Sequence, residues 1–421
     1  STLFLDNRTP RLGFHNTIFG NFWLSHFFSV CWSIFWYLAS QKGCAIRASR
    51  GSSLRINMRV LQLLPELKFG GVERGTVDLS HYLSSLGHDS AVVSAGGRLV
   101  EKLSSHGANH FPLPIAKKNF LALKQFMKLR DIYLEFQPDI IHVRSRFPAW
   151  INFLALKSMA SKKPIVISTF HGLYSKPFYS KSMSYADEII AISKTVQDYV
   201  FKNYDVDKSR VHLIYRGCDM QEFNTSAPSE AWSISWYEEF PQTRNKTLLT
   251  LPGRITGWKG IEDFLKLFSQ LDEAKYHGLI PGPVNGNKKR YFQSLLALVK
   301  KYKLESAITF CGARTDIANI YKISDIVFNL SSKPEPFGRT IIEAAACGTH
   351  VMGWNRGGVK ESIDMINPRG LVQFGDTDGL VNQIPHLLQC SPPSSIPPSF
   401  TKERLVEETV KVYESAIQRE R

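Results

Sequence analysis

The sequence has no pair of cysteines at the C-x-x-C spacing that zinc and redox sites use. Its six cysteines are scattered along 421 residues, at Cys31, Cys44, Cys218, Cys311, Cys347 and Cys390. The pattern therefore carries neither a metal signature nor a disulfide framework, and a reducing compartment is its simplest setting. A G-x-G-x-x-G dinucleotide fingerprint and an internal repeat of fixed short period are also absent.

Acidic residues are scarcer than basic ones. The chain holds 37 Asp and Glu against 52 Lys and Arg, a net charge of +15. A basic balance suits nucleic acid, an anionic membrane surface or phosphorylated substrates. Because no recognition motif and no basic strip interleaved with aromatic residues is present, a nucleic-acid-binding protein is the least favoured of these interpretations. With 43% hydrophobic residues, the chain can build the cores of two or three domains.

The first 57 residues differ from the rest. Residues 18–39 are apolar and aromatic and long enough to span a bilayer, but they contain Asn21, His26 and four Trp or Tyr residues. "MRVLQLLPEL" at Met58 looks like a natural start. We therefore interpret residues 1–57 as an extension that precedes the folded protein. The alternative is a single-pass membrane anchor at residues 18–39. A signal peptide is disfavoured because no A-x-A-like site follows cleanly.

From Met58 onward, short apolar runs alternate with helix-like stretches. The runs are "RVLQLL", "SAVVSA", "DIIHV", "PIVIST", "EIIAIS" and "VHLIY". Solid apolar strands that alternate with helices are typical of a parallel sheet covered on both faces. Residues 58–223 are therefore predicted to form one doubly wound α/β domain.

The alternation stops at residues 224–246, which are interpreted as a connection, and then resumes. "TLLTLPG", "HGLIPG", "AITFCG", "DIVFNL", "HVMGW" and "GLVQF" predict a second α/β domain over residues 247–390. A Pro/Ser stretch follows, and residues 401–421 show helical spacing. Two doubly wound domains imply a central cleft, with ligands at the carboxyl ends of the strands.

Charged residues of the second domain cluster at these predicted strand ends. Arg254 and Lys259 lie on a loop that leads into a helix, where two cations suit a diphosphate, although solvated loop cations are the alternative. In "KPEPFGRTIIEAAACG", a helix is predicted to begin near Gly338, with Glu335 ahead of it and Glu343 inside it. An i, i+4 pair between Glu343 and Arg339 is the structural alternative.

The first domain carries its own candidates. Gly70 and Gly71 open a helix, and glycine lets the backbone approach a ligand closely, although a tight turn explains them equally well. His171 follows the strand "PIVIST" and is able to hydrogen-bond a sugar hydroxyl or a phosphate, although a lone histidine is more often structural. Arg144 and Arg146 stand at another strand end and suit an anionic acceptor, or are surface charge.

These motifs, taken as a set, resemble the retaining glycosyltransferases of family 4, which have the GT-B fold. "EPFGRTIIE" matches the family's E-x7-E pattern, and "GRITGWKG", "HGLYS" and the "GG" loop stand in the family's order. The resemblance extends from about Met58 to the last helix. "GGVERGTVDLS", "VVSAGGRLV" and "HVRSR" are most similar to bacterial enzymes that build the lipopolysaccharide core or related surface glycans.

The resemblance implies a role for each matching residue. Arg254 and Lys259 would hold the donor diphosphate, and Glu335 would contact hydroxyls of the donor sugar. The other implied donor contacts are the backbone N–H groups of Phe337 and Gly338, Glu343 at the ribose, and Gly70 and Gly71 on the closing domain. Arg314 is a candidate from its position alone, because "FCGARTD" puts it at a further predicted strand end, where a base or a phosphate is expected. His171 would lie near the transferred sugar. The resemblance also implies that the last helix returns to the first domain and that no metal is needed.

The expected activity is transfer of a hexose, heptose or amino sugar, with retention, from a nucleotide sugar to a glycan or lipid-linked acceptor. The enzyme is expected in the cytoplasm, peripheral on an anionic membrane surface. A nucleotide-sugar epimerase of the same architecture is the alternative enzyme, although no acid or base pair for it is visible. In "LIPGPVNG", Pro281 and Pro283 depart from the family's usual pattern and would reshape the edge of the donor pocket.

Overall fold

In the computed structural model, the described residues are 57–68, 70–116, 122–160, 163–174, 177–284 and 286–420. The predicted extension and its apolar run at residues 18–39 lie outside them, apart from residue 57. Within the described ranges, no helix is both long enough and apolar enough to cross a membrane. The interpretation of residues 18–39 as an anchor or an extension therefore stays a prediction.

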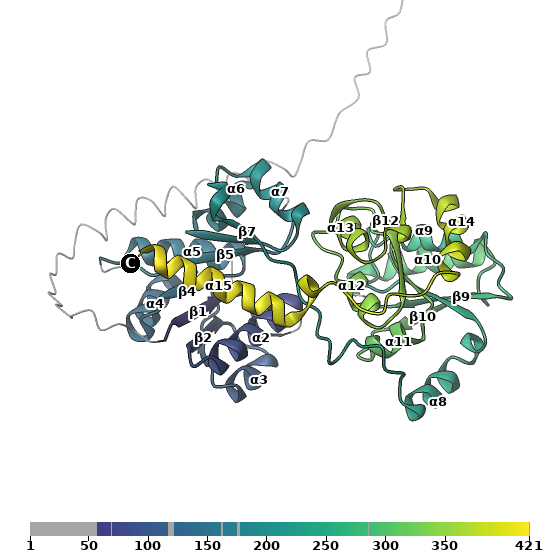
Figure 1. The fold of residues 1–421 in the computed structure, drawn as a ribbon, viewed down its shortest axis with the longest axis horizontal. Helices are drawn as coiled ribbons and strands as arrows, with labels where there is room; N and C mark the ends of the chain where they lie inside the picture. Colours follow the sequence, from purple (N-terminus) through teal and green to yellow (C-terminus); the bar gives the residue numbers. More distant parts are fainter. Residues whose placement is uncertain are drawn as a thin grey trace, which may run out of the picture. The chain divides into compact units, whose positions relative to one another are not determined.

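The first half of the described chain builds a parallel sheet of seven strands in the order β3-β2-β1-β4-β5-β6-β7 (Figure 1). The strands are β1 (Arg59–Leu63), β2 (Asp89–Ser94), β3 (Asn109–Pro112), β4 (Ile140–Val143), β5 (Ile165–Phe170), β6 (Glu188–Ala191) and β7 (Val211–Leu213). The helices of this half are α2 (Gly71–Ser85), α3 (Leu99–Ser105), α4 (Ala122–Phe136), α5 (Arg146–Lys157), α6 (Pro177–Ser180) and α7 (Lys194–Asn203).

The second half builds a parallel sheet of six strands in the order β10-β9-β8-β11-β12-β13. The strands are β8 (Thr247–Thr250), β9 (Tyr276–Pro281), β10 (Ile308–Gly312), β11 (Ile326–Asn329), β12 (His350–Trp354) and β13 (Leu371–Val372). The helices are α8 (Glu230–Glu239), α9 (Ile261–Phe268), α10 (Lys289–Lys301), α11 (Ile317–Ile323), α12 (Arg339–Ala346), α13 (Gly357–Ile366), α14 (Thr377–Leu388) and α15 (Lys402–Glu420). The predicted fold class, two doubly wound parallel sheets, is confirmed.

Both faces of the first sheet are buried, as its solid apolar strands predict. Val60 of β1 and Ile140 of β4 enter one apolar cluster, while the next residues, Leu61 and Ile141, enter another on the opposite face. Tyr413 of α15 belongs to the first of these clusters. The last helix therefore packs against the first sheet, as Figure 1 shows.

Strand order reverses once in each sheet. In the first sheet β1 lies between β2 and β4, and in the second β8 lies between β9 and β11. The loops after β1 and β4 therefore diverge, as do those after β8 and β11. A crevice forms at such a switch point, where open α/β sheets bind their ligands. The topology alone therefore predicts that the loops after β1, β4, β8 and β11 form the ligand-binding site.

The structure adds two elements that the sequence analysis did not anticipate. The strand β3 has the sequence "NHFP", which lacks an apolar run. The interpreted connection, residues 224–246, contains α8, whose Trp236 is buried with Leu248, Leu279 and Ile320 of the second half. This helix is therefore part of the second core.

Candidate active site

A partly buried ion pair joins the two loops of the second switch point. The Lys259 ammonium nitrogen lies 2.6 Å from Glu335 Oε1, and the two side chains are 16% and 11% exposed. The hydroxyl of Ser331, at the end of β11, donates to the same carboxylate oxygen. Lys259 also lies 4.5 Å from the centre of the Trp258 ring. Sequence reasoning selected both charges, but only the structure shows that they meet.

Glycines allow these loops to approach one another. Gly260, just ahead of α9, has φ +75°, and a Cβ there would lie 1.9 Å from the carbonyl oxygen of Leu330. Similarly, a Cβ at Gly282 would lie 1.8 Å from the carbonyl oxygen of Gly253. At this edge of the sheet, the loops after β8, β9 and β11 therefore lie so close together that only glycine fits at positions 260 and 282.

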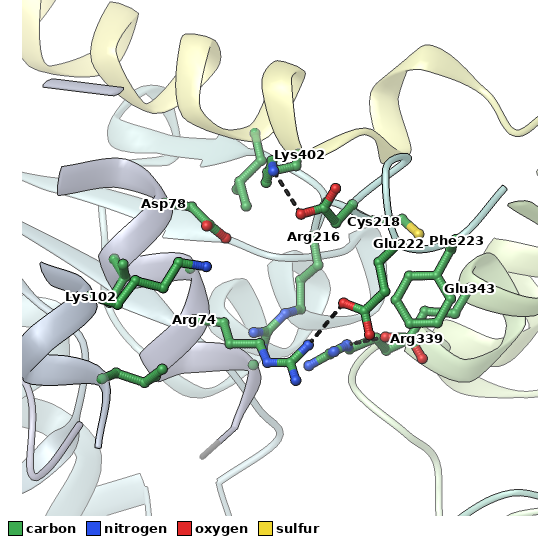
Figure 2. A pocket seen from close by; sticks show the side chains of 17 residues that line it. Arg74, Asp78, Lys102, Arg216, Cys218, Glu222, Phe223, Arg339, Glu343 and Lys402 are labelled. Carbon is green, nitrogen blue, oxygen red and sulfur yellow. Dashed lines mark hydrogen bonds and ion pairs between the residues drawn. The ribbon is translucent and has the colours of Figure 1, made fainter. Parts of the chain in front are cut away.

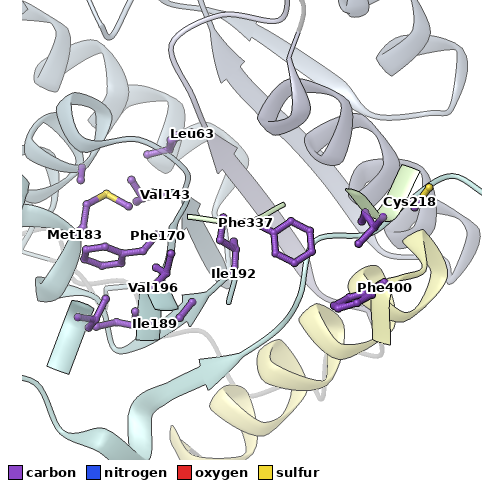
Figure 3. Packing of buried hydrophobic residues seen from close by; sticks show 14 of the residues in the cluster. Leu63, Val143, Phe170, Met183, Ile189, Ile192, Val196, Cys218, Phe337 and Phe400 are labelled. Atoms are coloured by element: carbon purple, nitrogen blue, oxygen red, sulfur yellow. The ribbon is translucent and has the colours of Figure 1, made fainter. Parts of the chain in front are cut away.

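The helix that follows Glu335 begins at Arg339, with Gly338 at its N-cap, and no side chain caps it. Within the described ranges, the backbone N–H groups of Phe337 and Gly338 donate no hydrogen bond. Free N–H groups at a helix N-terminus favour an anion or a hydroxyl-rich ligand. The Phe337 side chain points elsewhere: it is 3% exposed and packs against Tyr215 and Phe400. Figure 3 shows Phe337 and Phe400 in the same apolar cluster.

Glu343 forms the i, i+4 pair that the sequence left open as an alternative. Its Oε1 accepts from Arg339 Nε at 2.6 Å, and the residue is 6% exposed. Burial raises the pKa of the Glu343 carboxyl, while Arg339 opposes that shift. The pair lines a cavity of about 280 Å³ whose other walls come from α2, α3, the segment after β7 and α15 (Figure 2).

Arg254 and Arg314 differ in their surroundings. Arg254 is exposed, and its side chain has no partner among the residues that the structure describes. Arg314 is held by two carboxylates: it pairs with Asp316 at 2.7 Å and with Glu239 of α8 at 3.0 Å. Any contact between Arg314 and a nucleotide therefore has to compete with these acids, so its predicted role stays a prediction.

His171, at the end of β5, is a buried imidazole without hydrogen bonds. Neither Nδ1 nor Nε2 has a partner among the described residues, although both atoms are inaccessible to solvent. Burial, followed by the positive charges of Arg216 and Arg144, holds the pKa of His171 well below its usual range. A neutral imidazole able to donate and accept therefore lies at a predicted strand end.

The two arginines after β4 have separate environments. Arg144 is 7% exposed, donates from Nη1 to Gln62 at 2.8 Å, and leaves its buried Nε without a partner among the described residues. Arg146 instead places its guanidinium over Tyr174 and Tyr179, at 4.6 and 5.2 Å from the ring centres. Of the two, Arg144 faces the first switch point.

Gly71 lies where guanidinium groups from both halves meet. A Cβ at Gly71 would lie 2.5 Å from Arg216 Nη2 and 2.5 Å from Arg339 Nη1. Sequence reasoning missed Arg216, which follows β7 in "IYRGCD". Its position shortly after a strand end, the signal that selected Arg144, would have selected it as well. Gly70, with φ +155°, faces the Glu73 carboxylate instead.

The predicted site residues therefore fall into groups. Lys259 and Glu335 are in contact, and Glu343 and Gly71 line one cavity with Arg216. No group of three or more His, Cys, Asp or Glu side chains within the described ranges is arranged to hold a metal ion. Two Asp-x-Asp triplets occur, but Asp207 and Asp376 each accept a backbone N–H two or three residues later. Metal-free chemistry stays a prediction.

Two family models match consecutive parts of the chain. The model described as Glycosyltransferase Family 4 matches residues 69–222, and the one described as Glycosyl transferases group 1 matches residues 235–400. The chain is a glycosyltransferase of the GT-B type. The first match contains Gly70, Gly71 and His171, and the second contains the ion pair of Lys259 and Glu335.

Several known proteins are similar to this glycosyltransferase. The N-acetyl-alpha-D-glucosaminyl L-malate synthase of Bacillus anthracis is 24% identical over 274 residues, which are 62% of this chain and 68% of that protein. A glycosyltransferase structure from Rickettsia africae has a TM-score of 0.76 and 27% identity, covering 86% of this chain and 99% of the other. Anabaena Alr3699/HepE, solved with UDP and glucose, has a TM-score of 0.71 and 19% identity over 85% of this chain and all of its own, which shows the shared fold.

Proposed function

We propose that this glycosyltransferase moves a hexose, heptose or amino sugar from a nucleotide sugar to a glycan or lipid-linked acceptor, with retention of configuration. The observation that carries the donor site is the partly buried pair of Lys259 and Glu335, which lies just ahead of the uncapped N-terminus of α12. A cation, free N–H groups and a carboxylate at a switch point suit the phosphates and hydroxyls of one nucleotide sugar.

In this proposal, Lys259 and Arg254 bind the diphosphate. When the bond to the sugar breaks, negative charge develops on the departing phosphate, and these cations stabilise it together with the N–H groups of α12. Glu335 is already oriented by Lys259 and Ser331, so it positions the donor sugar by accepting from its hydroxyls. Glu343 accepts from the ribose, and Arg339 holds its carboxylate in place.

The reaction then proceeds through an oxocarbenium-like centre at the donor carbon. The acceptor hydroxyl attacks from the face that the nucleoside diphosphate leaves, and the departing phosphate oxygen takes the hydroxyl proton. A new glycosidic bond forms as the bond to the phosphate breaks, and the configuration is retained. His171 lies near the transferred sugar as a neutral imidazole, and no metal takes part.

The setting proposed for this reaction is the synthesis of lipopolysaccharide or other cell-surface glycans at the cytoplasmic face of a membrane. The net charge of +15 supports it, because basic residues near an anionic surface each contribute about 1 kcal/mol. Partition of the full chain and of a variant without residues 1–57 onto vesicles with and without anionic lipid tests this. If both proteins bind equally well to vesicles with and without anionic lipid, the proposed attraction to an anionic membrane is wrong.

A panel of UDP-, GDP- and ADP-sugars in a thermal-shift assay tests the donor, because a ligand that binds only the native state raises its melting temperature. At least one nucleotide sugar is expected to do so and to release its nucleoside diphosphate when an acceptor is added. NMR of the product then reports the anomeric configuration. If no nucleotide sugar binds, the proposed function is wrong. If a nucleotide sugar binds and is epimerised without an acceptor, the protein is the alternative enzyme, an epimerase.

A further inference from the structure

Four guanidinium groups gather around the first two turns of α2. Gly71 and Gly75 lie four residues apart on one face of this helix. A Cβ at Gly71 would contact Arg216 and Arg339, and a Cβ at Gly75 would lie 3.5 Å from Arg144 Nη2. Figure 2 shows the side chains of Arg74, Arg216 and Arg339 converging beside this helix. Gly71 therefore leaves the space that Arg216 and Arg339 occupy, whereas the Gly75 position would make only an ordinary contact with Arg144.

Not all of these charges are balanced. Arg74 pairs with Glu222 at 3.2 Å, and Arg339 pairs with Glu343. Arg216, which is half-buried, forms no hydrogen bond or ion pair with any described residue, although the carboxylates of Glu73 and Glu343 attract its charge. The buried Nε of Arg144 also lacks a partner among the described residues. Glu73, in the first turn of α2, turns back over Gly70. Among the described ion pairs it has none with Arg144 or Arg216, and it acts on both only through its charge.

Burying an unpaired cation is costly, and like charges nearby add to that cost. Burial, followed by Arg339 and then Arg144, lowers the pKa of Arg216 to about 10. The neighbouring His171 is also buried without a hydrogen bond at either ring nitrogen. The Nε of Arg144 after β4, the imidazole of His171 after β5 and the guanidinium of Arg216 after β7 thus lack a hydrogen-bond partner among the described residues. All three lie near the N-terminal part of α2.

We propose that Arg216, Arg144 and His171, at the N-terminus of α2, bind an anionic group of the acceptor, a phosphate or a carboxylate. The proposal rests on the proposed function, since it names the chemical class of the acceptor. The loops involved follow β1, β4, β5 and β7 of the first sheet. The donor diphosphate is assigned to Arg254 and Lys259, on a loop of the second sheet, so the two sets of cations serve two anions.

The geometry suits an oxyanion in particular. An arginine fork offers paired N–H donors that match two oxygens of a phosphate or carboxylate, and α2 is long enough for its N-terminus to add to the attraction. Neutral His171 supplies one further donor. Arg146 is not part of this site, because its guanidinium lies over Tyr174 and Tyr179.

The test uses the full chain saturated with UDP, or with GDP or ADP if the panel selects it, so that the donor phosphates are occupied. Inorganic phosphate and acetate are then titrated by calorimetry. We expect one of these anions to bind and Arg216→Gln to weaken it about 10- to 100-fold, while the affinity for UDP stays within about twofold. Arg404→Gln on α15 is the control, since it removes an exposed charge and is expected to change neither affinity.

The outcomes show which anionic group the acceptor carries. Phosphate binding identifies a phosphorylated acceptor, and acetate binding identifies a carboxylate. If Arg216→Gln does not fold, Arg216→Lys decides, because it keeps the charge and loses the fork; we expect several-fold weaker binding. The inference is overturned if both Arg216 variants bind the anion as the wild type does, or if phosphate competes with UDP and is lost only in Lys259→Gln. If UDP binds but neither anion does, this inference fails while the proposed function stands.

Discussion

The Lys259 ammonium group and the Glu335 carboxylate, 76 residues apart in the sequence, lie 2.6 Å from one another. They come from the loops after β8 and β11, the two strands between which the order of the second sheet reverses. The contact fixes the distance between these loops at the point where an α/β sheet binds its ligand.

Removing either charge of this pair is expected to abolish most of the transfer. Lys259→Gln removes a cation that stabilises the leaving phosphate, and Glu335→Gln frees Lys259 and loses an acceptor for the sugar. Each is expected to lower kcat by about 100-fold or more, the scale seen when one preorganised electrostatic contact is lost. Steady-state kinetics with the selected nucleotide sugar measure this.

The control for that pair is Lys360→Gln, which breaks an exposed i, i+4 pair with Asp364 on α13. Surface pairs of this kind contribute about 0.5 kcal/mol or less, so activity and stability are expected to stay near the wild type. Near-wild-type turnover by either Lys259→Gln or Glu335→Gln would remove that residue from the site.

Glu343→Gln separates binding of the ribose from a structural role. If the carboxylate accepts from the ribose, the substitution is expected to raise the KM for the nucleotide sugar about tenfold, since a charge-assisted hydrogen bond is weakened, and to change kcat less. Glu408→Gln on α15, which breaks the exposed pair with Arg404, is the control. A fall in melting temperature with unchanged KM would show that Glu343 only holds Arg339.

Gly260→Ala tests whether the loop before α9 needs the absence of a side chain. Its φ of +75° is costly for alanine, and the new Cβ would also collide with the Leu330 carbonyl. Gly107→Ala is the matched control, because φ is +79° there and no atom lies within 4 Å of the added Cβ. Chemical unfolding is expected to show a loss of about 1–2 kcal/mol for Gly107→Ala and of 3 kcal/mol or more for Gly260→Ala. If both variants lose the same free energy of unfolding, the collision with the Leu330 carbonyl does not contribute.

A buried histidine is expected to make the protein less stable in mild acid. Burial, with a smaller effect from Lys246, lowers the pKa of His277 to about 4, and its Nε2 bonds to the Thr309 hydroxyl at 2.8 Å. Above pH 6.5 the imidazole is neutral in both states, so stability is complete. As pH falls from about 6.5 to 4, His277 binds a proton in the unfolded chain but not in the native one, so the free energy of unfolding declines.

Between pH 7.5 and pH 5, His277 alone is expected to account for a loss of about 2 kcal/mol in the free energy of unfolding. The pKa values of His142 and His171 are lowered in the same direction, so the total decline is larger. Urea unfolding of His277→Gln at both pH values should therefore show a decline smaller by about that amount. His386→Gln, an exposed histidine, serves as the control. A decline equal to that of the wild type would contradict the assignment.

The sequence predicted elements best where local pattern and packing agree. The runs that became β1, β4 and β8 are continuous and apolar because both faces of each sheet are covered, and the start of α12 was marked by Pro336 and Gly338. The strand β3 was missed because "NHFP" lies at the edge of its sheet, where it needs little apolar character. In α8, Trp236 fills the second core without a clear helical pattern around it.

By itself, the sequence determined the succession of strands and helices apart from β3 and α8, the position of charges at strand ends and the resemblance that named the donor residues. These depend on local spacing, which the chain carries whatever its fold. Which of those charges meet was decided only by the tertiary structure, because strand order sets the partners. That order brought Lys259 to Glu335, held Arg314 against Glu239 of α8, placed Arg146 over two tyrosine rings, and put the unselected Arg216 beside Gly71.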